Sequence, residues 1–93
     1  MNTIRNTLIR YLDTEDLLYI EIYMKNGMNF RINEPKREEG IKIKAETKFL
    51  RIYGNIYGDV DGNKKIDTCI PYDNISYVSA GFGLEEIVSN QEE

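Results

Sequence analysis

The chain contains no histidine and no tryptophan, and it has a single cysteine, Cys69. Without histidine, the sequence lacks the commonest general base near neutral pH and the commonest ligand of transition metals. Serine–histidine–aspartate, cysteine–histidine and zinc–water chemistries are therefore excluded. A single cysteine can form neither a disulfide within the chain nor a cysteine-rich metal cluster. These absences predict a protein that is not an enzyme and that needs no cofactor.

Long apolar runs are also missing. No stretch approaches the roughly 18 apolar residues of a membrane-spanning helix, and residues 1–13 have neither the apolar centre nor the cleavage site of a signal peptide. We therefore expect a cytoplasmic protein with no membrane contact, in a compartment where a lone cysteine stays reduced. A chain this short buries only about 60–65% of its unfolded surface, so we expect pairing into a dimer or small ring to add stability.

Charge is distributed unevenly along the chain. Residues 1–65 hold all 12 basic residues and ten of the 16 acidic ones, whereas residues 66–93 hold six acids and no base. We expect residues 1–83 to form one domain and residues 84–93 to form an acidic, partly disordered tail. The base-free end, residues 66–93, could meet a basic surface of a partner, or it could simply keep the protein soluble. Its acids are Asp67, Asp73, Glu85, Glu86, Glu92 and Glu93.

The clearest pattern is a pair of alternating segments, residues 17–24 and 28–32, joined by Lys25-Asn26-Gly27. Alternation of apolar with polar or aromatic residues predicts half-buried strands. The Asn-Gly pair favours a type I′ turn, in which both residues have positive φ. The same alternation predicts further strands at residues 41–45, 49–58, 65–70 and 75–79, with a tight turn at residues 71–74 before the last strand.

Near the N-terminus, Ile4, Leu8, Ile9 and Leu12 recur at helical spacing and predict one amphipathic helix over residues 3–12. The expected fold is therefore mainly β. It is a small, strongly bent antiparallel sheet of five to six strands, or a barrel, and the N-terminal helix covers one open end.

Two segments resemble the small β-barrels of the Sm-like family: YIEIYMKNGMNFRI resembles its first strand pair, and IPYDNISYV its closing segment. The resemblance implies an Sm-like barrel and a tendency to form rings. Family members that bind RNA carry an Asp-x-apolar-Met-Asn pattern after the second strand and an Arg-Gly pair near the last. This chain instead has Asn33-Glu34-Pro35 and Pro71-Tyr72-Asp73 at those places.

A local resemblance concerns calcium. Residues 59–67 are similar to the calcium loop of dockerins and EF-hands, which would make Asp59, Asp61, Asn63 and Asp67 the oxygen ligands. Lys64 replaces the glycine that the sharp turn of such a loop needs, and Ile70 replaces its bidentate acid. A plain hairpin turn at Asp61-Gly62 explains the same residues, so both interpretations stay open.

Tyrosines and basic residues are predicted to share an outward binding face, made of Tyr19, Tyr23, Arg31, Lys42, Lys44, Tyr53 and Tyr57. Such residues suit a protein partner, and they are also the ingredients of a face for single-stranded nucleic acid. The sequence pI of about 4.9 disfavours nucleic acid, because neutralisation of phosphates supplies most of that affinity.

The sequence thus favours a small non-enzymatic protein that acts through protein–protein interaction, as phage or mobile-element inhibitors of host defence systems do. The partner itself is not indicated. One alternative is an Sm-like ring that binds RNA or a small nucleotide through Lys42, Lys44 and Tyr23. The other is a structural domain stabilised by calcium.

Overall fold

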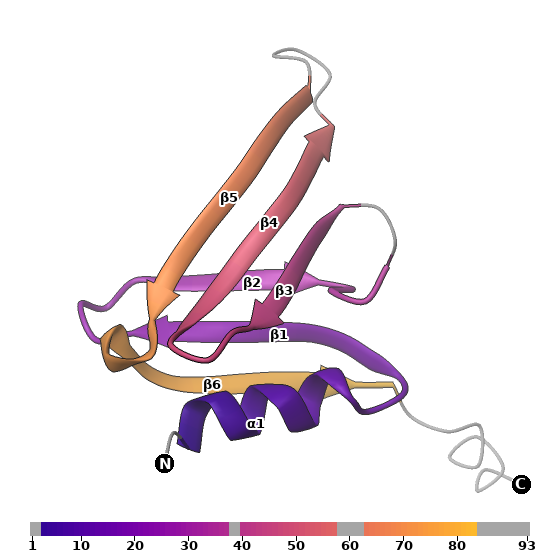
Figure 1. Ribbon diagram of the computed structural model, residues 1–93. Coiled ribbons are helices and arrows are strands. Elements are labelled where there is room, and N and C mark those ends of the chain that lie inside the picture. The colour runs from indigo at the N-terminus through magenta and orange to yellow at the C-terminus, as the bar shows by residue number, and fades with distance from the viewer. Residues whose placement is uncertain (1–2, 38–39, 58–62, 84–93) are drawn as a thin grey trace, which may run out of the picture.

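The computed structural model describes residues 3–37, 40–57 and 63–83. It is mainly β, with one N-terminal helix and six antiparallel strands (Figure 1). The elements are α1 (Thr3–Leu12), β1 (Leu17–Met24), β2 (Asn29–Asn33), β3 (Ile41–Ala45), β4 (Phe49–Tyr57), β5 (Asn63–Pro71), the 3-10 helix Tyr72–Asn74 and β6 (Ile75–Phe82). Each lies within three residues of the segment that the alternation predicts. Among the described residues, no helix is both long enough and apolar enough to cross a membrane.

The strands form two sheets, with the orders β2-β1-β6 and β3-β4-β5, so the prediction of one bent sheet is wrong. The division has a local cause just after β2. The Glu34 N–H still donates to the Leu18 carbonyl (2.7 Å), but Glu34 has a φ of +49° and its own carbonyl accepts from the Arg37 N–H (3.1 Å). The chain therefore turns away before β3, and the described strands do not close into a barrel.

The turn between β1 and β2 also differs from the prediction. Gly27 has a φ of +95°, but Asn26 does not have positive φ, so the turn is not type I′. The Gly27 N–H donates to the Met24 carbonyl (3.0 Å), and the Asn26 side-chain oxygen accepts from the Met28 N–H (3.0 Å). This arrangement matches a type I turn followed by a glycine bulge. The Asn26 side chain supplies a local hydrogen bond that the backbone pattern alone does not reveal.

The core lies where the inner faces of the two sheets meet. Ile20 and Ile22 of β1 pack with Leu50 and Ile52 of β4, and Leu8 of α1 completes the cluster. The helix contacts β1, β3 and β6, so it joins the two sheets along one side (Figure 1). These buried side chains are the apolar positions of the alternating segments, which is why the strands form where they do.

A polar contact between the helix and the second sheet centres on the Glu46 carbonyl. It accepts from the buried Tyr72 hydroxyl (2.6 Å) and from Nε of Arg5 (2.9 Å). Burial raises the pKa of Tyr72 above its ordinary value of 10.0. One donor comes from α1 and the other from the 3-10 helix, so the two bonds tie the residue that follows β3 to both elements.

The strands of the second sheet differ in length. Strand β3 has five residues, whereas β4 and β5 have nine each, so their hairpin extends beyond β3 and projects past the first sheet (Figure 1). Gly54 pairs with Ile66, and Ile56 pairs with Lys64. Ile56 of β4 and Ile66 of β5 therefore lie on the same face of this extension, on its two strands. Ile52, at the level of the core, is 7% exposed, whereas Ile56 is 43% exposed. The inner face of the hairpin therefore continues beyond the part that the first sheet covers.

Candidate functional site

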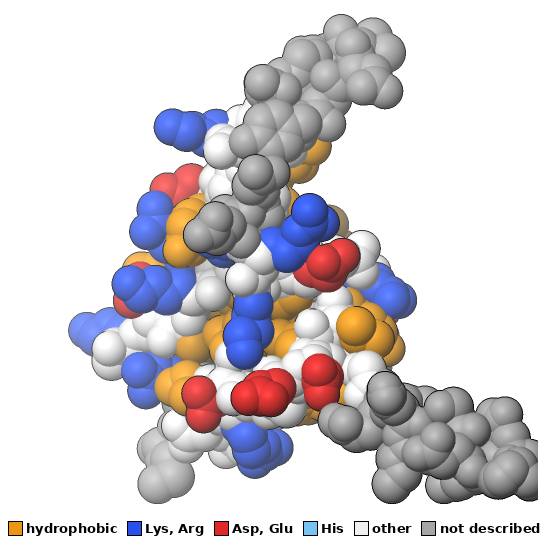
Figure 2. Space-filling view, turned by 90° about the vertical axis from the view of Figure 1, so that its right-hand side faces the viewer, with side chains coloured by type: hydrophobic (Ala, Val, Ile, Leu, Met, Phe, Trp, Pro, Cys, Tyr) orange, Lys and Arg blue, Asp and Glu red, His pale blue; other side chains and the backbone are white. Residues whose placement is uncertain are grey.

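An apolar groove of about 500 Å³ lies between β2 and the inner face of the second sheet. Its apolar lining consists of Phe30, Ile32, Ile41, Ile52, Ile56 and Ile66, and Arg31, Asn33 and Thr68 add polar groups. Phe30 and Ile56 are 38% and 43% exposed. Hydrophobic side chains also reach the surface between charged ones in the space-filling view (Figure 2). The groove has the size and the apolar character of a typical binding site.

One wall of the groove is an edge strand, since β2 pairs with β1 and with no other described strand. The bonds from Glu34 to Leu18 and from Met24 to Met28 (2.8 Å) set the hydrogen-bonding phase of that pair. In an antiparallel ladder such bonds involve alternate residues. Even-numbered residues of β2 therefore bond to β1, and the backbone groups of Asn29, Arg31 and Asn33 point towards the free edge.

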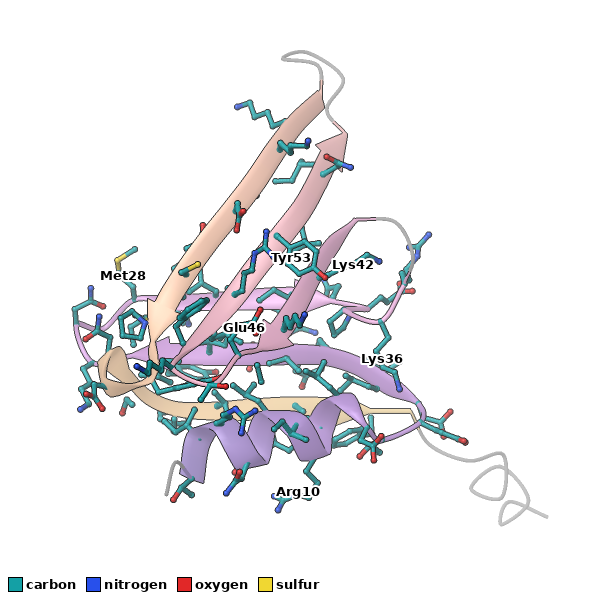
Figure 3. All side chains as sticks on the ribbon, in the orientation of Figure 1. Arg10, Met28, Lys36, Lys42, Glu46 and Tyr53 are labelled. Carbon is teal, nitrogen blue, oxygen red and sulfur yellow. The ribbon has the colours of Figure 1, made fainter. Side chains whose placement is uncertain are left out.

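Basic side chains gather at the end of β2. A second hollow of about 630 Å³ is lined in part by Arg31, Lys36 and Arg37, with Glu34 as its one acid. Lys36 donates to the Thr14 carbonyl (3.3 Å), and Arg37 pairs with Glu34 at 3.7 Å. Figure 3 labels Lys36 beyond one end of β2 and Met28 at the other end, in the β1–β2 turn. The chain has a net charge of −4, yet the lining of this hollow is positive.

Of the predicted binding residues, Tyr19 and Arg31 pack against each other on the outer face of the first sheet. The Arg31 guanidinium carbon lies 3.8 Å from the centre of the Tyr19 ring. The ring also lies against Gly81, where an added Cβ atom would overlap ring atoms Cε2 and Cζ. Because Arg31 already stacks on the ring and the ring lies against Gly81, Tyr19 is not the free stacking surface that the sequence suggests for a nucleic-acid base.

Tyr23 lies on the same outer face and stacks on Tyr77 of β6, with ring centres 4.3 Å apart and planes 9° apart. Its hydroxyl donates to Glu21 (2.9 Å), and this hydrogen bond is the main reason that the pKa of Tyr23 is raised. Arg31 approaches the same Glu21 carboxylate at 3.5 Å. The tyrosines of this sheet are thus engaged with their neighbours on adjacent strands.

Lys42, Lys44 and Tyr53 lie on the outer face of the second sheet, where Lys42 and Tyr53 are labelled in Figure 3. Lys42 donates to the Arg37 carbonyl, and Lys44 lies 3.9 Å from a Glu46 oxygen. The inner faces of the two sheets meet in one core, so their outer faces point away from each other. The predicted binding face is therefore divided, and Tyr23 is not brought together with the two lysines.

The same outer face holds a bidentate ion pair across β4 and β5. Two nitrogens of Arg51 donate to the two carboxylate oxygens of Asp67, each at 2.9 Å. These bonds lower the pKa of Asp67 and raise that of Arg51. The Arg51 guanidinium also lies 4.6 Å from the centre of the Tyr53 ring. Cys69 is on this face as well and is exposed.

Several predicted residues lie outside the described part of the chain. They are the side chain of Tyr57, the acids Glu85, Glu86, Glu92 and Glu93, and the calcium candidates Asp59 and Asp61. The backbone of Asn63 begins β5, and Asp67 lies in the middle of that strand. Within residues 3–37, 40–57 and 63–83, no group of three acidic or cysteine side chains is placed to hold a metal. The calcium loop and the acidic tail stay predictions.

The sequence did not reveal the groove residues Phe30, Ile56 and Ile66 as a site. A signal was present, because the predicted strand over residues 49–58 is twice as long as the one over residues 41–45. A long strand beside a short one leaves part of its inner face without a neighbour.

No family model matches this chain, and no curated protein or solved structure matches it.

Proposed function

We propose that this protein is a non-enzymatic binding module whose partner is another protein, held in the groove between β2 and the β4–β5 hairpin. The observation that carries the proposal is the groove itself, an open apolar surface bounded by a strand with unpaired backbone groups. Scattered apolar side chains are normal on a protein surface, but a contiguous apolar hollow marks an interaction site.

The exposed fractions support this choice. Phe30 and Ile56 line the groove from the two sheets and are 38% and 43% exposed, while Ile32 and Ile52, which also line it, are 6% and 7% exposed. A partner that covers Phe30 and Ile56 would remove further apolar surface from water. This burial would stabilise the complex by about 25 cal/mol for each Å² of apolar surface. A protein partner supplies such a cover, in the manner of the small phage or mobile-element inhibitors to which the composition points.

The RNA or nucleotide alternative has less support. Its predicted residues Lys42 and Lys44 lie on one outer face and Tyr23 on the other, and Arg31 already stacks on the Tyr19 ring. The Sm-like resemblance rests on residues 19–32 and 70–78 of the sequence. That resemblance still implies a ring, and the dimer or small ring stays a prediction.

The test is a pull-down from the source cell or its phage-infected host with the full chain as bait. Nuclease and chelator treatments run in parallel with two variants, Ile56→Glu in the groove and Ile9→Glu on α1. These two isoleucines are 43% and 41% exposed, so the variants place the same charge at sites of similar burial. We expect the bait to capture a protein whose binding survives both treatments. The Ile9→Glu variant should still capture that protein, and the Ile56→Glu variant should not. Loss on nuclease treatment would favour RNA, and loss with chelator would favour calcium.

A further inference from the structure

We infer that the partner inserts an extended segment that adds as a strand to the free edge of β2, with an acidic residue opposite Arg31 and apolar residues on either side of it. This inference rests on the proposed protein-binding function and specifies how the groove is filled. Its starting point is the backbone of Arg31, whose N–H and C=O point away from β1. An edge strand with unpaired backbone groups is a template for one more strand.

The geometry of the groove suits one added strand. Phe30 and Ile32 are on the inner face of β2, and Ile56 and Ile66 of the projecting hairpin line the same groove. A strand bonded to β2 would point every second side chain towards these four residues. The side chains between them would lie on the outer face beside Arg31. Apolar residues at alternate positions are therefore required of the segment.

The other free edges are less suited to this role. Strands β3, β5 and β6 are also edges: α1 contacts β6, whereas β3 and β5 carry Lys42, Lys44 and Lys65 on their outer face. Lysine on an edge strand discourages pairing with another strand. Strand β2 contains no lysine, and it is the edge that borders the apolar groove.

Charge selects the residue opposite Arg31. Residues directly opposite in an antiparallel pair lie on the same face, and opposite charges there are favourable. The Arg31 side chain is 53% exposed, lies 3.5 Å from the Glu21 carboxylate and donates to the Asn33 side-chain oxygen (3.2 Å). Lys36 and Arg37 line the hollow beside it together with one acid, Glu34, so the net positive charge there favours a carboxylate on the added strand. The preferred segment reads apolar, acidic, apolar.

The same charges argue against pairing of β2 with β2, β3 or β5 of a second copy of this chain. Pairing β2 with β3 or β5 of another copy would bring Lys42, Lys44 or Lys65 towards Arg31. Pairing β2 with itself around its central residue would place Arg31 opposite Arg31. Like charges directly opposite each other destabilise a strand pair.

The experiment selects binders to the full chain from a library of short random peptides and measures their affinity for four variants. Arg31→Pro removes the free-edge donor, and the β1–β2 bonds survive because even-numbered residues make them. Arg31→Ala is its control, since it removes the side chain and retains the N–H. Ile56→Glu and Ile9→Glu are the groove variant and its matched control.

We expect the selected peptides to share the apolar–acidic–apolar pattern. Their affinity should fall about tenfold or more in Ile56→Glu, stay unchanged in Ile9→Glu, fall about threefold in Arg31→Ala and fall about another tenfold in Arg31→Pro. Should Arg31→Pro fail to fold, N-methylation of the peptide residue opposite Arg31 removes bonds of the same ladder, and it should weaken binding to the unaltered chain to a similar degree.

Three results would overturn the inference, and they differ from one another. Peptides that depend on Ile56 but bind Arg31→Pro as well as Arg31→Ala would leave the groove as a binding site and exclude strand addition. Selection of no peptide that depends on Ile56 would count against the groove and the proposed function together. A dimer in light scattering that Ile56→Glu dissociates would identify a second copy as the occupant.

Discussion

The two sheets use the same alternation of residues but leave different surfaces open. In the first sheet, the inner face is covered by the second sheet and by α1, and the tyrosines of the outer face are engaged with their neighbours. In the second sheet, the outer face is charged, and the inner face extends beyond its cover. The first sheet contributes an unpaired edge to the groove, and the second contributes an unpaired face.

This difference shows that an apolar residue on an inner face is not necessarily part of the core. Leu50 and Ile56 are on one strand, yet Leu50 is 0% exposed and Ile56 is 43% exposed. What separates them is the position at which the shorter strands end. Replacing a groove residue should therefore change the free energy of unfolding little, and replacing a core residue should lower it strongly, although both are aliphatic.

The largest effect is expected at the core end of β4. Leu50→Ala should lower the free energy of unfolding by about 2–5 kcal/mol, because it removes buried methyl groups and leaves a cavity. Ile56→Ala on the same strand should cost less than about 0.5 kcal/mol. Urea unfolding followed by circular dichroism measures both. Equal losses would contradict the division of β4 into a covered and an open part.

An intermediate effect is expected on the outer face of the first sheet. Gly81→Ala places a methyl group where the Tyr19 ring lies, so the ring must leave Arg31, at a cost of about 1 kcal/mol. Tyr19→Ala should cost a similar amount, and the double variant no more than either single one. Urea midpoints of the three variants give the coupling. Additive losses would show that the ring does not depend on the space above Gly81.

The smallest effect is expected at the exposed ion pair of the second sheet. Arg51 lowers the pKa of Asp67 in the folded protein below the ordinary value of 3.8. The pair therefore contributes stability above about pH 4, and this contribution is lost as the pH falls through the folded-state pKa. Asp67→Asn should be less stable than the unaltered chain at pH 7 and no less stable near pH 2. A difference that persists in acid would exclude the charge as its cause.

Much of the fold follows from local patterns, and the site does not. Helix α1 and strands β1 and β3 lie on their predicted residues, since each has an uninterrupted apolar period. The separation into two sheets depends on Glu34, whose positive φ no residue pattern announced. The Asn26–Gly27 turn was located correctly, but its type depends on a side-chain hydrogen bond.

The residues predicted to form one binding face are divided between two faces for a different reason. Alternation tells which residues point outward from a strand, but it does not tell which outward faces coincide in space. Tyr23 and Lys44 are both outward, yet they lie on sheets whose outer faces point apart. The groove depends on the relative lengths of β3 and β4, which only the assembled sheets reveal.

The position of the lone thiol has a practical consequence. Cys69 is exposed on the outer face of the second sheet, whereas the groove lies on the inner face. A fluorophore attached there through a maleimide would report on tumbling and on distance without occupying the groove. Because the chain contains no other cysteine, the unaltered sequence is already suited to single-site labelling, and occupancy of the groove can be followed without an engineered residue.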